Sequence, residues 1–125
     1  RLTMSIPGCV IVSGDTPKKE RERILEMFKV GEIPVVANVG VLTTGFDYPE
    51  LDTVVMARPT MSLAMYYQIV GRCIRPHKDK EAAWFVDLCG NINRFGEVSD
   101  LHLKDTGNGK WAVFSRGRQL TNVRF

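Results

Sequence analysis

Three polar side chains with convergent spacing stand in the run QIVGRCIR, residues 68–75. Arg72 and Arg75 are three residues apart and Gln68 precedes Arg72 by four, so on a helix all three project from one side. Two guanidinium groups at one helical end could hold a phosphoryl group and stabilise the charge that develops on it during transfer. Two surface arginines paired with carboxylates have the same spacing, so spacing alone leaves both interpretations open.

Two further segments, residues 13–16 and 41–49, follow apolar runs that are typical of strands. In open parallel α/β sheets, ligands bind at the carboxyl ends of the strands, and we expect these segments and residues 68–75 to lie there. A glycine lets a phosphate approach backbone N–H groups at a helix N-terminus, and hydroxyl and carboxylate groups can contact phosphate and ribose. Ordinary turns have the same composition, so each segment alone is weak evidence. The candidate residues are Gly14, Thr43, Thr44, Gly45 and Asp47.

Short apolar runs alternate with helical patterns over most of the chain. This order predicts βαβ units and a parallel sheet whose strands are buried on both faces. Thr16 and Ser62 are typical helix N-caps, because a side-chain oxygen there can accept a backbone N–H. The expected strands cover residues 9–12, 34–38, 53–57 and 83–87, and the expected helices cover residues 17–30 and 63–73.

The C-terminal residues have a different pattern. Residues 101–104 and 110–114 alternate between apolar and polar side chains, which is typical of strands with one solvated face. The turn between them contains Asn108 and Gly109, a pair that favours a tight hairpin. We therefore expect a β-hairpin after the α/β part of the chain, with a third strand near residues 120–125.

Charge is distributed unevenly along a chain of otherwise ordinary composition. The 125 residues have a net charge of +3, with 44% hydrophobic and 25% charged residues, which is typical of a folded domain. Residues 1–100 carry a net charge of −1 and residues 101–125 carry +4, so attraction for nucleic acid should concentrate in the second part. A solubilising end has the same composition. We expect an α/β domain over residues 1–100 and a basic hairpin extension over residues 101–125.

The cysteines and histidines give little sign of metal chemistry. Cys9, Cys73 and Cys89 are widely spaced among apolar residues, which fits buried thiols in a cytoplasmic protein better than disulfides or a metal site. His77 and His102 fit ordinary surface or hairpin positions. No apolar run approaches the roughly 18 residues that a membrane helix requires, and no signal-peptide pattern opens the chain. We expect a cytoplasmic location, no metal site and no membrane partner.

Three motifs in matching order resemble the second lobe of DEAD/DEAH-type superfamily 2 helicases over residues 9–96. The run KERERILEMFKVG is similar to the KER…FRxG helix of that family, VVANVGVLTTGFD resembles motif V, and QIVGRCIR resembles motif VI, Q/HxxGRxxR. The runs VLTTGFD, RPT, YYQIVGRCIRP and DLCGN are most similar to the RadD/YejH-like branch. The resemblance implies a three-layer RecA-like (P-loop NTPase-type) fold, with helices on both faces of a parallel sheet that is truncated at its N-terminus.

The resemblance also implies half of an ATP-hydrolysing site. Arg75 would be the arginine finger that reaches the γ-phosphate of ATP, Arg72 would act on the same phosphate, and Gln68 would contact the acidic motif of another lobe. The chain contains no GxxxxGK[ST] phosphate loop and no DExD/H box. Those motifs belong to an N-terminal RecA-like lobe of the same parent protein. That lobe would bind most of the ATP and its Mg²⁺, so this fragment alone should be inactive.

The remaining motif residues would contact the two ligands. Gly45 and Asp47 would lie at the nucleotide, whereas Gly14, Thr43 and Thr44 would touch the nucleic-acid backbone rather than its bases. The favoured function is the C-terminal motor lobe of an ATP-dependent helicase or translocase, and the RadD-like kinship favours DNA over RNA. The alternative is a noncatalytic module that binds DNA or RNA without ATP, through the basic hairpin and the Gly14 loop. A third hypothesis, an α/β phosphate-binding enzyme acting alone, lacks a convincing nucleophile or base.

Overall fold

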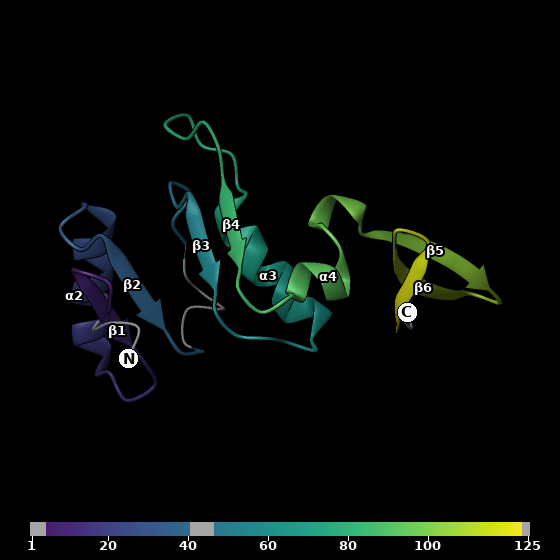
Figure 1. Ribbon diagram of the computed structural model, residues 1–125, viewed down its shortest axis with the longest axis horizontal. Coiled ribbons are helices and arrows are strands. Elements are labelled where there is room, and N and C mark those ends of the chain that lie inside the picture. Colours follow the sequence, from purple (N-terminus) through teal and green to yellow (C-terminus); the bar gives the residue numbers. More distant parts are fainter. Residues whose placement is uncertain (1–4, 41–46, 124–125) are drawn as a thin grey trace. The chain divides into compact units, whose positions relative to one another are not determined.

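The computed structural model describes residues 5–40 and 47–123, and the chain divides into two compact units, residues 1–48 (unit 1) and 49–125 (unit 2; Figure 1). Within the described residues, each unit contains one pair of parallel strands, and unit 2 also contains a three-stranded antiparallel sheet. The predicted parallel α/β elements and the C-terminal hairpin are thus confirmed. The arrangement of helices on both faces of one sheet stays a prediction.

Two parallel strands joined by a helix form unit 1. Its elements are β1 (Cys9–Val12), α2 (Lys18–Lys29) and β2 (Val35–Asn38). Val12 lies opposite Asn38, so both strands end at the same edge of the pair. Ile24 of α2 packs against Val12 and Ile33 in a buried apolar cluster, and this burial holds the helix on one face of the strands.

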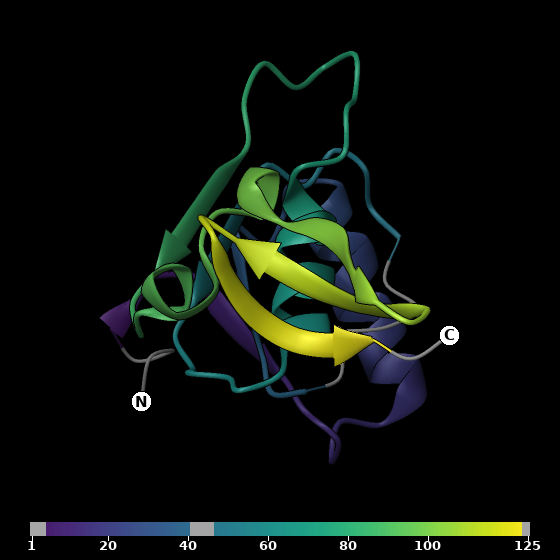
Figure 2. The same cartoon turned by 90° about the vertical axis from the view of Figure 1, so that its right-hand side faces the viewer.

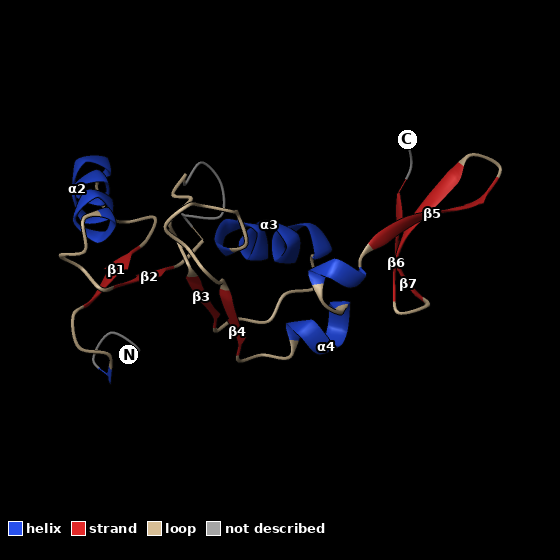
Figure 3. Cartoon of the chain, turned by 90° about the horizontal axis from the view of Figure 1, so that it is seen from above, coloured by secondary structure: helices blue, strands red, loops and turns tan. Residues whose placement is uncertain are grey.

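Unit 2 begins with a second strand–helix–strand arrangement. Its first elements are β3 (Thr53–Met56), α3 (Leu63–Cys73), β4 (Trp84–Asp87), α4 (Asn91–Phe95) and the 3₁₀ helix η1 (Val98–Asp100). Ser62 caps α3 as predicted, because its hydroxyl accepts the N–H of Met65 at 3.2 Å. Figure 3 shows one helix beside each parallel pair, α2 beside β1 and β2 and α3 beside β3 and β4.

The core of unit 2 forms around Tyr66, which is 1% exposed. Its ring stacks on Phe95 with the centroids 5.1 Å apart, and its hydroxyl donates to the carbonyl oxygen of Gly96 at 2.8 Å. The outer face of the strands is different, since Val55 is 56% and Trp84 is 65% exposed. The prediction that the strands are buried on both faces is therefore wrong for the described β3 and β4. The packing partner that the structure shows for this pair is α3, which covers one face.

The C-terminal strands form an antiparallel sheet, and Figure 2 shows the last two strands, coloured yellow, running side by side. Its strands are β5 (His102–Gly107), β6 (Lys110–Ser115) and β7 (Arg118–Val123). Asn108 and Gly109 have φ angles of 54° and 69°, the left-handed conformation that a tight two-residue hairpin turn requires. The predicted hairpin is confirmed. Across residues 5–40 and 47–123, every helix is too short or too polar to cross a bilayer.

Candidate nucleotide and nucleic-acid site

The turn at residues 13–16 follows β1 and presents Gly14 at the carboxyl edge of unit 1. The N–H of Ser13 donates to Oγ1 of Thr16 at 3.0 Å, and the N–H of Thr16 donates to the carbonyl oxygen of Ser13 at 3.2 Å. Because Thr16 serves this turn, Pro17 occupies the N-cap position of α2, and the prediction of a Thr16 cap is wrong. Gly14 is exposed with no atom within 4 Å of the place a Cβ would take, which leaves room for a ligand at the backbone.

The segment that resembles motif V ends at Asp47, and Tyr48 follows it directly. Asp47 is exposed, while the half-buried Tyr48 donates its hydroxyl to the carbonyl oxygen of Lys29 at 3.3 Å. The Tyr48 ring also meets Phe28 edge to face, with the centroids 5.7 Å apart. Tyr48 is therefore anchored to α2 and fixes the backbone next to Asp47, a positioning role that the sequence did not reveal. The candidates that lie outside the described residues are Thr43, Thr44 and Gly45.

Gln68 and Arg72 lie on α3 four residues apart, so they project from the same side as the spacing predicts. Gln68 is exposed and Arg72 is half-buried in the last turn. The helix ends at Cys73, and Arg75 follows the C-cap because Pro76 disfavours helical backbone at the residue before it. Because Arg75 lies past the end of α3, helical spacing does not set the direction of its side chain, which depends instead on the backbone of the segment that follows the helix.

The end of α3 lies at the edge where β3 begins. Lys80 Nζ donates to the carbonyl oxygen of Cys73 at 2.8 Å and to that of Leu51 at 3.0 Å, two residues before β3. Ser62, at the start of the helix, instead follows the carboxyl end of β3. The expectation that residues 68–75 lie at the carboxyl ends of the strands is therefore wrong, because they belong to a helix that runs back along the pair.

A polar cluster occupies the carboxyl edge of β3 and β4. The Asp87 carboxylate accepts the N–H of Ile92 at 2.8 Å, the N–H of Cys89 at 3.1 Å and Nδ2 of Asn91 at 2.9 Å. Burial raises the pKa of Asp87, but these hydrogen bonds outweigh it and hold the pKa below its ordinary value. The carboxylate thus stays charged while it shapes the turn that leads into α4.

Asn91 is the centre of this cluster and is fully buried. Its Oδ1 accepts the N–H of Thr60 at 2.9 Å, and its Nδ2 donates to the carbonyl oxygen of Arg58 at 3.1 Å. Arg94 adds a bond from Nη1 to the carbonyl oxygen of Thr60 at 3.0 Å. The loop after β3 is therefore held to α4, and no spacing in the sequence pointed to this connection.

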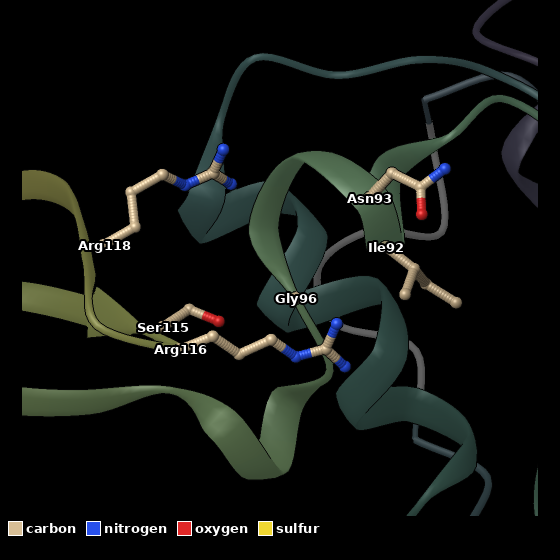
Figure 4. A pocket seen from close by; sticks show the side chains of 6 residues that line it. All are labelled: Ile92, Asn93, Gly96, Ser115, Arg116 and Arg118. Carbon is tan, nitrogen blue, oxygen red and sulfur yellow. The ribbon is translucent and has the colours of Figure 1, made fainter.

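A pocket of about 220 Å³ lies between α4 and the antiparallel sheet, and its side chains are drawn in Figure 4. Two arginines extend from the sheet side, and both have partners within the protein. Arg116 pairs with Asp100 at 2.7 Å and with Glu97 at 3.6 Å, and Arg118 donates to the carbonyl oxygen of Arg94. We therefore assign this pocket to the joint between α4 and the sheet. Its lining residues are Ile92, Asn93, Gly96, Ser115, Arg116 and Arg118.

Metal-binding groups and cysteines add no second candidate. Within residues 5–40 and 47–123, no three His, Cys, Asp or Glu side chains gather as a metal site. The three cysteines are free, and burial raises the pKa of the Cys73 thiol, which keeps it protonated.

Comparisons with known proteins agree with each other. The family described as the helicase conserved C-terminal domain matches residues 5–77. A protein of Saccharomyces cerevisiae named ATP-dependent helicase IRC3 is 38% identical over 79 residues, which are 63% of this chain and 12% of that protein. The 51.5 kDa protein of Lactococcus phage (isolate 7-9) is 34% identical over 104 residues, which are 82% of this chain and 23% of that protein.

A solved structure has a similar fold. It is the C-terminal domain of the DEAD-box protein Dbp5, which superimposes with a TM-score of 0.54 at 26% sequence identity. The match covers 74% of this chain and 54% of that one. The chain therefore spans about half of the solved domain and less than a quarter of the two relatives above.

Proposed function

Because the chain belongs to the helicase conserved C-terminal domain family, we propose that it is the C-terminal motor lobe of an ATP-dependent helicase or translocase. The family match over residues 5–77 carries this proposal, because it includes α3 and both arginines beside its end. The activity belongs to a longer protein, since the chain spans 12% and 23% of the two relatives described above.

The proposed role of this lobe is to complete a site between two lobes. ATP with Mg²⁺, held mainly by an N-terminal RecA-like lobe, supplies the phosphoryl group and the charge that must be stabilised. Arg75 contacts the γ-phosphate and Arg72 supports it, while the exposed Gln68 contacts the other lobe. Both arginines are half-buried, and a guanidinium group in a less polar setting attracts a phosphate more strongly than an exposed one. Asp47 and Gly45 complete the nucleotide side.

The proposed nucleic-acid contacts lie in unit 1. Gly14, Thr43 and Thr44 hold the sugar-phosphate backbone, and the open space at Gly14 supports this role. Residues 1–100 form the motor lobe and residues 101–125 form its basic extension. The kinship proposed with the RadD-like branch favours DNA as the substrate, and the free cysteines agree with a cytoplasmic protein.

The replacement Arg75→Ala in the intact protein tests the proposal. We expect nucleic-acid-stimulated ATPase activity to fall by about 10³-fold or more, because an arginine finger acts mainly in the transition state. The melting temperature should stay within a few degrees of that of the wild type. Arg23→Ala, at an exposed position on α2, is the matched control and should retain full turnover. Unchanged turnover in the Arg75 variant would refute the assignment.

A second function, noncatalytic binding of nucleic acid, is favoured by the antiparallel sheet. The strand register places Lys104 opposite Ala112 and His102 opposite Phe114, so these residues share one face with Lys110. Both lysines are exposed. Replacing Lys104 and Lys110 with glutamate should weaken binding to single-stranded nucleic acid and lower its salt dependence, whereas Lys78→Glu should not. Equal affinities for all variants would exclude the sheet as a binding element.

A further inference from the structure

Lys80 joins the segment that follows α3 to the segment that precedes β3. Its Nζ donates to the carbonyl oxygens of Cys73 at 2.8 Å, Pro49 at 2.9 Å and Leu51 at 3.0 Å. An ammonium group has three N–H donors, so these carbonyl oxygens account for all of them. The side chain is half-buried, and hydrogen bonds to a charged donor are among the stronger ones in proteins.

A second set of contacts holds the same two segments together. His77 Nε2 lies 3.4 Å from a carboxylate oxygen of Glu50, which stands between the Lys80 acceptors Pro49 and Leu51. The N–H of Lys80 donates to the carbonyl oxygen of His77 at 3.0 Å, which closes a turn over residues 77–80. This turn is therefore fixed to residues 49–51 at two places.

Arg75 lies between two fixed points. On one side, the N–H of the C-cap Ile74 donates to the carbonyl oxygen of Val70 at 3.3 Å. On the other side stands the turn that Lys80 fixes. The carbonyl oxygens of the last helical turn have no partner within the helix, so a cation at Cys73 both satisfies one of them and complements the helix dipole.

We propose that Lys80 is the positioning residue of Arg75: it sets the direction in which the arginine leaves the end of α3. This inference rests on the proposed function, in which Arg75 acts on the γ-phosphate of ATP. Lys80 itself touches backbone oxygens and no reacting atom. Its effect should therefore appear in the turnover number, because an arginine finger displaced by about 1 Å loses transition-state stabilisation rather than ground-state affinity.

The experiment compares Lys80→Met and Lys80→Arg with Lys78→Met in the intact protein. Methionine keeps much of the aliphatic stem and removes all three donors, so kcat should fall by about tenfold to a hundredfold while KM for ATP changes by less than about threefold. Arginine keeps the charge but presents a planar fork to three convergent oxygens, so its kcat should lie between those of Lys80→Met and the wild type. The exposed Lys78, two residues away, should be replaceable without loss.

Adding Lys80→Met to Arg75→Ala gives the decisive comparison. If Lys80 acts through Arg75, the second replacement should lower kcat no further, because the two losses are not additive. A multiplicative loss, or a lower melting temperature with normal kcat, would overturn the inference. If Lys80→Met does not fold, Lys80→Arg with wild-type kcat would overturn it as well. Normal turnover in Arg75→Ala alone would instead refute the proposed function.

Discussion

Two polar clusters lie at opposite edges of the β3–β4 pair and differ in what their side chains contact. At the carboxyl edge, Asn91 and Asp87 bond to backbone groups of the loops around them, so their polar atoms are engaged within the protein. At the other edge, Arg72 and Arg75 carry charge on long side chains beside the end of α3, and Lys80 holds the backbone there. The first cluster holds loops of the fold in place. The second cluster places two charged side chains at a backbone segment that Lys80 holds in position.

The difference shows which kinds of residue a sequence can reveal. A residue that acts on a phosphate must be of a particular type, so Arg72 and Arg75 stand out within a motif. A residue that holds the backbone in position needs only one suitable hydrogen-bonding group, and many residue types can supply such a group. The structural roles of Asn91 and Lys80 follow only from their contacts with residues about 30 positions away in the chain, such as Thr60 and Pro49.

The largest stability effect in this comparison is expected for Asn91→Ala. The replacement removes a fully buried amide and breaks its part-buried hydrogen bonds to the N–H of Thr60 and the carbonyl oxygen of Arg58, so the free energy of unfolding should fall by about 3 kcal/mol. Urea unfolding of the intact protein measures this. The exposed Asn93, on the same helix, is the control, and Asn93→Ala should change stability by less than about 0.5 kcal/mol. Equal losses for both variants would show that the cluster does not stabilise the fold.

A smaller loss of about 2 kcal/mol is expected for Gly96→Ala at the joint between α4 and the sheet. Gly96 has a φ of 83°, and a Cβ there would lie 2.0 Å from Oγ of Ser115. Gly90→Ala is the control without a side-chain clash, because nothing lies within 4 Å of its Cβ position. Its φ of 74° and ψ of 24° lie in the αL region, which strains alanine less than the φ of 83° and ψ of 178° of Gly96. Adding Ser115→Ala should recover the part of the loss that the Oγ contact causes, because the Cβ of residue 115 lies at 3.3 Å, and leave the part that backbone strain causes. Melting temperatures measure this recovery. If Ser115→Ala does not raise the melting temperature of the Gly96→Ala variant, backbone strain alone causes the loss.

The fold was predictable where local chemistry sets it. The bounds of α3 agree with the sequence because Ser62 caps its start and Pro76 prevents its continuation, and the hairpin turn follows from Asn108 and Gly109. Helix α4 was not predicted, because five residues between two glycines carry no helical pattern and depend on the contact of Phe95 with the core. The roles of Asn91 and Lys80 were missed for the same reason, because they depend on contacts with distant residues and not on a local sequence pattern.

Part of the candidate site stays a prediction. Gln68 and Arg72 share one side of α3 as their spacing requires, whereas Arg75 lies past the helix, where tertiary contacts replace helical geometry. Gly14 and Asp47 are exposed, as a ligand contact needs, but exposure does not identify the ligand. The roles of all five depend on chemistry between this lobe and its partner, which the sequence of one lobe specifies only in part.

Protonation of Asp87 is the smallest perturbation of the carboxyl-edge cluster, because it removes a charge and leaves the carboxyl group in place. The pKa of Asp87 in the folded protein lies below its ordinary value of 3.8, since the N–H groups of Ile92 and Cys89 outweigh the effect of burial. A lowered folded pKa contributes stability above the unfolded pKa, and this contribution is lost as the pH falls through the folded value. The wild type should therefore exceed Asp87→Asn in free energy of unfolding at about pH 7, and the difference should shrink below about pH 4. Urea unfolding of both proteins across this range measures the difference, and a constant value would show that the charge of Asp87 does not stabilise the turn before α4.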